Sequence, residues 1–248
     1  MASARLHHHV LDETWLAAEG LIWSHSKVKG WCVMHAIDPR ATALTRARYD
    51  RNARRYDRMT CCTERLMTPG RAALWQRVRG PRVLEVGVGT GKSFPYYPAG
   101  MRITAIDLSP RMLEQAQVHA AHDHIEVDLR EADVQALPFP DASFDTVIAT
   151  CVFCSVPDPL LGLGELRRVL VGGGQLLLLE HVLSHRPLLG RMMNLINPLV
   201  VRRMGANINR ETVENVRRVG FSELTVEDLW LDIVKRIEAR TPSLVVAT

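Results

Sequence analysis

Residues 82–91 read Arg-Val-Leu-Glu-Val-Gly-Val-Gly-Thr-Gly, an apolar run that ends in three glycines at alternate positions. A short apolar run of this kind is typical of a buried strand. Glycines after a strand allow a sharp turn and a close approach of a ligand, with the N–H groups of a helix start aimed at an anion. A dinucleotide site spaces its glycines G-x-G-x-x-G, whereas here Lys92 follows Gly91. The spacing therefore argues against a nicotinamide oxidoreductase.

Glu85 adds an electrostatic criterion. A carboxylate beside the loop repels a pyrophosphate, but it suits a ligand that carries a sulfonium and an ammonium group. S-adenosylmethionine is such a ligand, and its own carboxylate can still bind to the N–H groups of the loop. Gly87, Gly89 and Gly91, together with Glu85, are therefore predicted to bind S-adenosylmethionine.

Strand-like and helix-like segments alternate after residue 82. Ser109-Pro110 starts a helix, with a capping serine and a proline in the first turn. The alternation predicts an α/β fold, a doubly wound seven-stranded and mostly parallel sheet with an N-terminal helical extension. In such sheets, ligands bind beyond the carboxyl ends of the strands. The predicted strands are 82–87, 102–107, 124–129, 144–150, 175–182, 222–229 and 231–237. Two further helices are predicted at 160–171 and 209–219, and Gly172-Gly173-Gly174 is expected to close the first of them.

Polar residues stand at the ends of the next predicted strands. Asp107 ends the second strand, where a carboxylate can accept both ribose hydroxyls of an adenosyl ligand. Asp133 follows the third strand, where it can accept from the adenine amino group while Val134 donates its backbone N–H. The other predicted cofactor contacts are Leu108 and Met112 after the second strand and Cys151 after the fourth.

The segment 82–182 resembles a known family, the class I S-adenosylmethionine-dependent methyltransferases of the ubiquinone/menaquinone-biosynthesis type (methyltransferase type 11). The resemblance lies in LEVGVGTG (84–91), AIDLSPRML (105–113), ADVQALPFPDASFDTVIA (132–149) and the PDP–ELRRVL–GGG run (157–174). It implies that Tyr56, in the stretch from Tyr49-Asp50 to Tyr56-Asp57, reaches over the cofactor. CSVPDP (154–159), LEHV (179–182) and ANINRETVENV (206–216) are similar to two branches, the microsomal thiol methyltransferases and the bacterial phosphatidylethanolamine N-methyltransferases.

The resemblance divides the chain into a methyltransferase domain, 46–240, and an N-terminal helical extension or lid, 1–45. Within the extension, residues 15–23 suggest an amphipathic helix, and His7-His8-His9 is read as a surface segment or a cloning remnant rather than a metal site. Residues 41–79 are predicted to be helical, with an interruption at 68–70.

The charge and cysteine patterns bear on partners and location. Residues 40–82 hold twelve arginines and three acids, a net charge of +9, which suits an anionic membrane, a nucleic acid or merely a solvated helix face. Five cysteines without a spaced framework favour a reducing compartment. We expect a cytoplasmic protein with optional peripheral contact to an anionic membrane. No metal is expected, because the C-x-x-C at 151–154 has no second pair of ligands.

The acceptor of the methyl group is expected to be a hydrophobic small molecule or a lipid, methylated on nitrogen or sulfur. His181, at the end of the fifth predicted strand, is the candidate base if the acceptor must lose a proton. The apolar and arginine-containing stretch 187–204 is expected to roof the acceptor pocket, to contact a membrane or to pack as an ordinary lid helix. The alternatives are a quinone-type C-methyltransferase and, outside this class, a nucleic-acid-binding protein or RNA methyltransferase that uses the arginines of 40–82.

Overall fold

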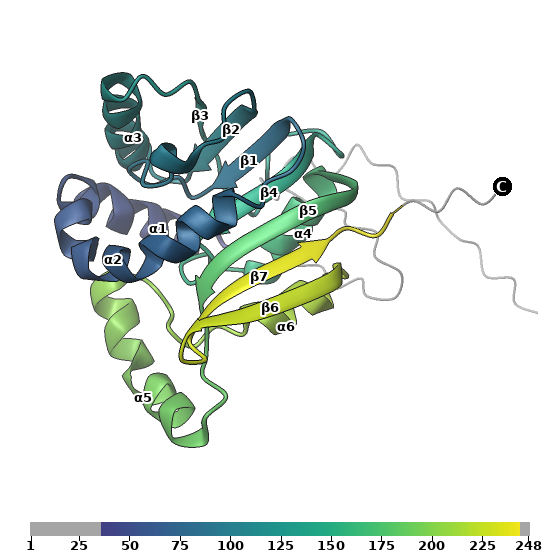
Figure 1. The fold of residues 1–248 in the computed structure, drawn as a ribbon. Helices are drawn as coiled ribbons and strands as arrows, with labels where there is room; N and C mark the ends of the chain where they lie inside the picture. Colours follow the sequence, from purple (N-terminus) through teal and green to yellow (C-terminus); the bar gives the residue numbers. More distant parts are fainter. Residues whose placement is uncertain (1–35, 244–248) are drawn as a thin grey trace, which may run out of the picture.

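The computed structural model describes residues 36–243, which form a seven-stranded sheet with helices on both faces (Figure 1). The strand order is β3-β2-β1-β4-β5-β7-β6, and every pair is parallel except the two that involve β7. This confirms the predicted α/β fold. The strands are β1 (Arg82–Val86), β2 (Arg102–Asp107), β3 (Asp128–Glu131), β4 (Phe144–Thr150), β5 (Leu170–His181), β6 (Ser222–Trp230) and β7 (Val234–Arg240). The helices are α1 (Pro39–Asn52), η2 (Ala53–Arg55), α2 (Tyr56–Trp75), η3 (Phe94–Tyr96), α3 (Pro110–His122), α4 (Pro159–Val169), α5 (Pro187–Met204) and α6 (Thr212–Arg218).

The core lies on both faces of the central strands. On one face, Leu74 and Trp75 of α2 pack against Leu177 and Leu179 of β5. On the other face, the buried side chains of α4 and α6 pack against alternate residues of the same strands, including Leu178. Central parallel strands that are buried on both faces read as continuous apolar runs, which is why β4 and β5 were recognisable from sequence.

Several local boundaries differ from prediction because tertiary packing overrides local propensity. The interruption expected at 68–70 is wrong, since α2 continues through Pro69 and buries Met67, Leu74 and Trp75. The helical run breaks earlier, at the 3-10 turn η2. The predicted strand 124–129 is shifted, because His124 has a positive φ and pairing with β2 begins only at Asp128.

The glycine run after α4 does not close the helix as predicted. The helix ends at Val169, and β5 begins at Leu170 beside Phe144 of β4. Gly173 has a positive φ of 73° and donates its backbone N–H to the Thr241 carbonyl. The run therefore belongs to an irregular start of β5, where glycine tolerates the left-handed conformation.

The N-terminal boundary of the methyltransferase domain is not marked by a break. Residues 39–45, assigned to the extension, form the start of α1, which continues without interruption across residue 46. Asp38 caps this helix by accepting from the N–H groups of Arg40 and Ala41. The predicted helix at 15–23 and the three histidines at 7–9 lie outside the described residues, and the boundary at 45 and 46 stays a prediction.

Candidate cofactor site

A cleft of about 680 Å³, partly open to solvent, lies beyond the carboxyl ends of β1, β2, β3 and β4. This is the position at which open α/β sheets bind ligands. Nine of the predicted cofactor residues line it: Tyr56, Gly87, Gly89, Asp107, Leu108, Met112, Asp133, Val134 and Cys151. The fold therefore brings together residues that are up to 95 positions apart in the chain (56 to 151).

The glycine loop after β1 is attached to β2. The backbone N–H groups of Gly87 and Val88 both donate to the Ile106 carbonyl, at 2.8 and 3.0 Å. Gly87, Gly89 and Gly91 all have positive φ values, which only glycine adopts at low cost. A Cβ on Gly89 would meet nothing within 4 Å, whereas one on Gly91 would lie 2.3 Å from the ring of Phe94. Gly89 therefore faces open space, and Gly91 makes room for a buried aromatic side chain.

The loop leads into a 3-10 helix and not into an α-helix. The glycine pattern predicts the N–H groups of a helix start at this point, but only η3 (Phe94–Tyr96) follows the loop. A three-residue turn has too few aligned peptide units for a helix macrodipole. Any anionic group of a ligand must therefore be bound by the individual N–H groups of the loop.

Asp107 is placed at the centre of the cleft wall by the end of β2. Its Oδ2 accepts from the N–H of Gly89 at 2.9 Å, and its Oδ1 accepts from the N–H of Ser109 at 2.9 Å. Burial raises the pKa of Asp107 from its usual value, and these backbone bonds oppose the rise. A carboxylate has about four acceptor positions, so two remain for a diol.

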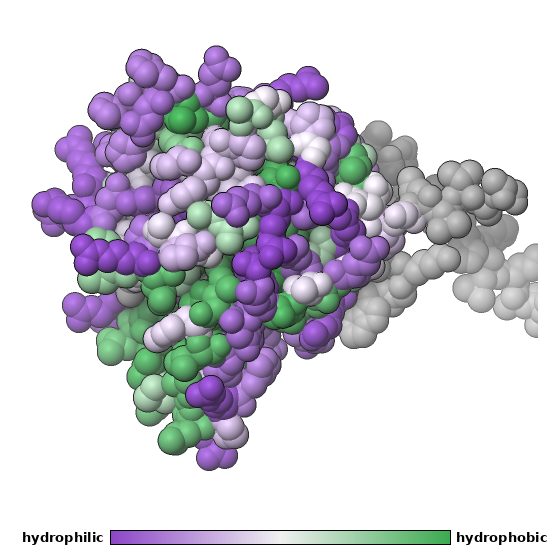
Figure 2. All heavy atoms as spheres, viewed as in Figure 1, coloured by the Kyte–Doolittle hydropathy of each residue, from purple (hydrophilic) through white to green (hydrophobic). Residues whose placement is uncertain are grey.

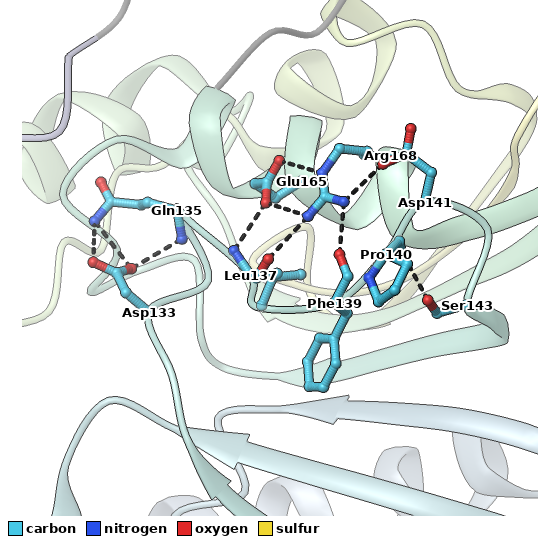
Figure 3. Close-up of polar contacts among 9 residues, drawn as sticks. All are labelled: Asp133, Gln135, Leu137, Phe139, Pro140, Asp141, Ser143, Glu165 and Arg168. Atoms are coloured by element: carbon cyan, nitrogen blue, oxygen red, sulfur yellow. Dashed lines mark hydrogen bonds and ion pairs between the residues drawn. The ribbon is translucent and has the colours of Figure 1, made fainter. Parts of the chain in front are cut away.

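Asp133 follows β3 and is bound to its own loop. Its carboxylate accepts from the backbone N–H and the side-chain Nε2 of Gln135, as Figure 3 shows. Thr42 of α1 also donates to it, at 3.3 Å. The carboxylate therefore has a fixed orientation in the cleft wall, next to the backbone of Val134.

The loop after Asp133 is held by a buried ion pair. Arg168 binds both oxygens of Glu165 and donates to the carbonyls of Leu137 and Phe139 (Figure 3). Glu165 in turn accepts from the N–H of Leu137 at 2.8 Å. One guanidinium thus donates hydrogen bonds to two carbonyls of the loop and to the Glu165 carboxylate. These bonds fix the path of the chain behind the cleft.

A helical cap, formed by α1, η2 and the start of α2, covers the cleft. Tyr49 and Tyr56 both line it, and their ring centroids lie 6.2 Å apart. Burial raises the pKa of both phenols, so they remain neutral at physiological pH. The spacing of the motif favoured Tyr56, and Tyr49 was missed as a lining residue.

Polar contacts attach this cap to the strand-end loops. Asp50 of α1 accepts from the Ser109 hydroxyl at 2.6 Å, and Asp57 of α2 accepts from the Thr90 hydroxyl at 2.7 Å. Arg46 donates to the Leu108 carbonyl at 3.1 Å. Each contact joins the cap to a loop that lines or borders the cleft, so the cap and the cleft wall form one structural unit.

The wall formed after β4 has an unusual backbone. Cys151 has a φ of +54°, which is unfavourable for a residue with a Cβ. The following turn is held by Glu180 of β5, whose Oε1 accepts from the N–H groups of Val152 and Phe153 at 2.8 and 3.0 Å. Glu180 is fully buried, and burial raises its pKa to about 7. Neither spacing nor charge in the sequence indicates this internal role of the carboxylate.

Three predicted site residues do not line the cleft. Gly91 contacts Phe94, and Glu85 is buried behind the loop, where it accepts a hydrogen bond from the Tyr97 hydroxyl. Burial raises the pKa of Glu85. His181 lies on the same face of β5 as Leu179, because residues two apart on a strand point the same way. This is the face that α2 covers. Their roles in binding or catalysis stay predictions.

Sequence reasoning missed several lining residues besides Tyr49. They lie on α1 or in the turn after β4, where neither spacing nor charge distinguishes them: Thr45, Val152, Ser155, Val156 and Pro157. Within residues 36–243, no group of three or more histidine, cysteine or acidic side chains is arranged to hold a metal ion. Cys151 and Cys154 are free thiols whose pKa values burial raises, that of Cys154 to about 12.

The sheet order and the strand-end cleft define the Rossmann-like methyltransferase class, and comparison with known proteins agrees. Residues 84–178 match the family model described as a methyltransferase domain. A S-adenosylmethionine-dependent methyltransferase from Thermotoga maritima has the same fold, with a TM-score of 0.61 at 22% identity over 79% of this chain and 99% of that chain.

Three curated relatives carry methyltransferase names. The chain is 41% identical to the phosphatidylethanolamine N-methyltransferase of Cereibacter sphaeroides over 45% of its length and 56% of the relative. It is 31% identical to the thiol S-methyltransferase TMT1B of Mus musculus over 58% of its length and 62% of the relative. It is 33% identical to the demethylmenaquinone methyltransferase of Clavibacter sepedonicus over 76% of its length and 86% of the relative. The chain belongs to the S-adenosylmethionine-dependent methyltransferase family. It spans less than two thirds of the length of the first two relatives.

Proposed function

We propose that this protein transfers the methyl group of S-adenosylmethionine to nitrogen or sulfur of a hydrophobic small molecule or a lipid. The observation that carries the proposal is the cleft itself. It combines a glycine loop with open space at Gly89, two carboxylates at successive strand ends, and an aromatic cap. This set of groups matches a ligand with a ribose diol, an adenine and a cationic amino acid.

The residues present fit the cofactor. Asp107 has two acceptor positions left for the ribose hydroxyls, and Asp133 and the Val134 N–H stand where the adenine is expected. The space at Gly89, which a Cβ would fill, admits the amino-acid end of the ligand. Leu108, Met112 and Cys151 supply apolar contacts. The third predicted acid, Glu85, would act on the ligand only through its electrostatic field, because it does not line the cleft.

When bound, S-adenosylmethionine supplies a methyl group on a sulfonium, and its departure leaves a neutral thioether. The protein therefore needs mainly to align the acceptor and to exclude water. The cap does both, since Tyr49 and Tyr56 cover the cleft and their attachment through Asp50 and Asp57 fixes them over it. The turn that Glu180 holds sets the wall at Cys151.

A base is needed only for an acceptor that must lose a proton, and His181 is proposed for that role. Burial lowers the pKa of His181, so the ring is neutral and able to take a proton. Its Nδ1 has no hydrogen-bond partner among the described residues. These two properties support the role, the position of the ring outside the cleft lining counts against it, and a turnover measurement on a variant decides it.

The choice of nitrogen or sulfur rests on the relatives, since one is named for phosphatidylethanolamine and another for thiols. A quinone-type C-methyltransferase is the second candidate. It is favoured by one observation, the match to a demethylmenaquinone methyltransferase over 76% of this chain. The proposal includes peripheral contact with an anionic membrane, where a lipid acceptor is presented.

The basic block 40–82 is partly neutralised by acids elsewhere in the fold, which weakens its attraction for any polyanion, whether a membrane or a nucleic acid. Arg46, Arg77 and Arg82 pair with acids outside the block, namely Glu131, Glu238 and Asp145. Their charge is therefore compensated locally, which leaves a weaker field than the sequence suggested. Among residues 36–243, no helix has the length and hydropathy of a membrane span.

Two measurements test the proposal. Calorimetry with S-adenosylmethionine and with its homocysteine product should give binding in the micromolar range, and no heat from either would remove the proposal. A screen with radiolabelled methyl donor should then label a thiol or a phospholipid amine. Label found only on quinols would establish the second candidate, and label found only on RNA would establish the nucleic-acid alternative.

A further inference from the structure

Helix α5 exposes an apolar stripe to solvent. Its four members recur at intervals of three and four residues, which places them on one face of the helix. Two of them are almost fully exposed, at 84% for Leu188 and 81% for Leu195. The stripe consists of Leu188, Met192, Leu195 and Leu199, and Ile196 borders it. A contiguous apolar surface of this kind on a soluble domain marks an interaction site.

The fold fixes which face of α5 points outward. On the inner face Met193 is buried, and the Asn197 side chain accepts from the N–H of Ile208 at 2.8 Å. Asn197 also donates to Asn207, 3.2 Å away. These contacts anchor the opposite side of the helix to the rest of the fold, and the apolar stripe stays exposed among residues 36–243.

The turn between β6 and β7 extends the same surface. Trp230 and Leu231 are about half exposed, at 46% and 47%. Asp232, next in this turn, accepts from the Ser184 hydroxyl and from the N–H of His185, just before α5. Figure 1 places the turn beside the start of α5, and Figure 2 shows apolar residues gathered over this part of the molecule. A tryptophan at the edge of an apolar surface suits a membrane interface.

Positive charge borders the stripe on one side and at its C-terminal end. From His181 to Arg210 the sequence contains five arginines and no acid. At about 100° per residue, Arg191 and Arg202 lie along one border of the stripe, and Arg203 lies at its C-terminal end. All three are exposed. Long arginine side chains beside an apolar stripe can reach lipid phosphates while the helix lies in the interface.

We infer that α5 and the β6–β7 turn dock on an anionic lipid bilayer, with the helix lying in the plane of the interface. This inference rests on the proposed function in one respect, since it names the surface of the proposed membrane contact. Charge argues against a second copy of the chain as the partner. A two-fold interface formed by α5 would bring its arginines from both copies together, and α5 itself carries no acid to pair with them.

The surface is connected to the cleft. Asn207, just after α5, donates its backbone N–H to the Cys154 carbonyl at 2.8 Å and its side-chain Nδ2 to the same carbonyl at 3.1 Å. Cys154 lies in the turn that forms the cleft wall after Cys151. Docking through α5 would therefore place the acceptor side of the cleft next to the lipid headgroups.

Vesicle sedimentation with the full chain tests the inference. The protein should sediment with vesicles of phosphatidylcholine and phosphatidylglycerol, bind weakly to phosphatidylcholine alone, and dissociate as salt is raised. Leu195→Glu and Leu188→Glu should each weaken binding about tenfold or more. Both sites are exposed, so the variants should fold. Val118→Glu, at a site 62% exposed on α3, is the matched apolar control and should bind like the parent.

A charge-reversal pair separates specific docking from general electrostatics. Arg191→Glu should weaken vesicle binding, whereas Arg217→Glu on α6 should change it by less than twofold. Parent-like binding by Leu195→Glu, or no sedimentation of the parent, would overturn the inference. A concentration-dependent dimer that Leu195→Glu abolishes, without vesicle binding, would replace it with self-association. Calorimetry with S-adenosylmethionine on the same variants measures cofactor binding independently of vesicle binding. Failure of the membrane inference is therefore distinguished from failure of the proposed function.

Discussion

The carboxylate of Asp107 accepts a hydrogen bond from the backbone N–H of Gly89, 2.9 Å away, and so joins the end of β2 to the loop after β1. One carboxylate oxygen thus binds the glycine loop, and the carboxylate still has acceptor positions for the hydroxyl groups of a ligand. The cofactor-binding wall is therefore assembled before any ligand arrives, which lowers the entropy lost on binding.

Asp107→Ala should weaken S-adenosylmethionine binding about 100-fold, because two charge-assisted hydrogen bonds at about 1.5 kcal/mol each would be lost. Calorimetry measures the change. Asp123→Ala, which removes an exposed acid at the end of α3, is the control and should leave the Kd unchanged. Equal affinities of the two variants would show that Asp107 does not bind the cofactor.

Two glycines of the same loop should respond differently to alanine. Gly89→Ala should give a folded protein with affinity reduced at least tenfold, since the Cβ enters the open space of the cleft at a positive φ. Gly91→Ala should mainly lower the melting temperature, since its Cβ would lie 2.3 Å from the Phe94 ring. Thermal unfolding and calorimetry on both variants check this contrast. A stable Gly91→Ala variant with lost affinity would instead place Gly91 at the ligand.

Arg168→Ala should lower the free energy of unfolding by about 3 kcal/mol, because it removes the guanidinium that binds both oxygens of the buried Glu165 carboxylate. The side chain of Glu165 is only 5% exposed. Arg217→Ala, which removes an exposed pair with Glu214, should change the free energy by less than about 0.5 kcal/mol. Denaturant unfolding compares them. Equal changes in the free energy of unfolding for the two variants would mean that the Arg168–Glu165 pair stabilises the fold no more than an exposed pair does.

The buried Glu180 should make stability depend on pH. Its folded pKa of about 7 lies above its usual value, so the folded state binds the proton more tightly and loses stability as pH rises from about 4.5 to 7. Glu180→Gln removes this titration while keeping an acceptor for Val152 and Phe153. Its stability relative to the parent should therefore increase between pH 5 and pH 8 in denaturant unfolding. A constant difference across that range would contradict the raised pKa.

His181→Ala should leave the cofactor Kd within about twofold, because the ring does not line the cleft. If it is the base, kcat should fall about 100-fold, and the loss should be smaller at high pH for an acceptor that ionises by itself. Turnover with an acceptor from the methyl-donor screen measures this. An unchanged kcat would limit His181 to a packing role under α2.

The sequence by itself determined the class of the sheet and the positions of the cleft residues on it. Strands buried on both faces, such as β4 and β5, produce continuous apolar runs, and glycines or acids placed directly after such runs must meet at one edge of a parallel sheet. For this reason Asp107, Asp133 and Gly89 were identified without coordinates. These features depend on local pattern and on the direction of the strands alone.

Only the tertiary structure decided what depends on packing between distant segments. Glu85 and Glu180 are both carboxylates at strand ends, yet one is bound to the Tyr97 hydroxyl and the other to the turn after β4. Tyr49 lines the cleft because α1 lies over the strand ends, and the apolar stripe of α5 is exposed because the opposite side of the helix, with Met193 and Asn197, packs inward. The partner of a side chain is set by the approach of elements far apart in sequence, and no local pattern encodes that approach.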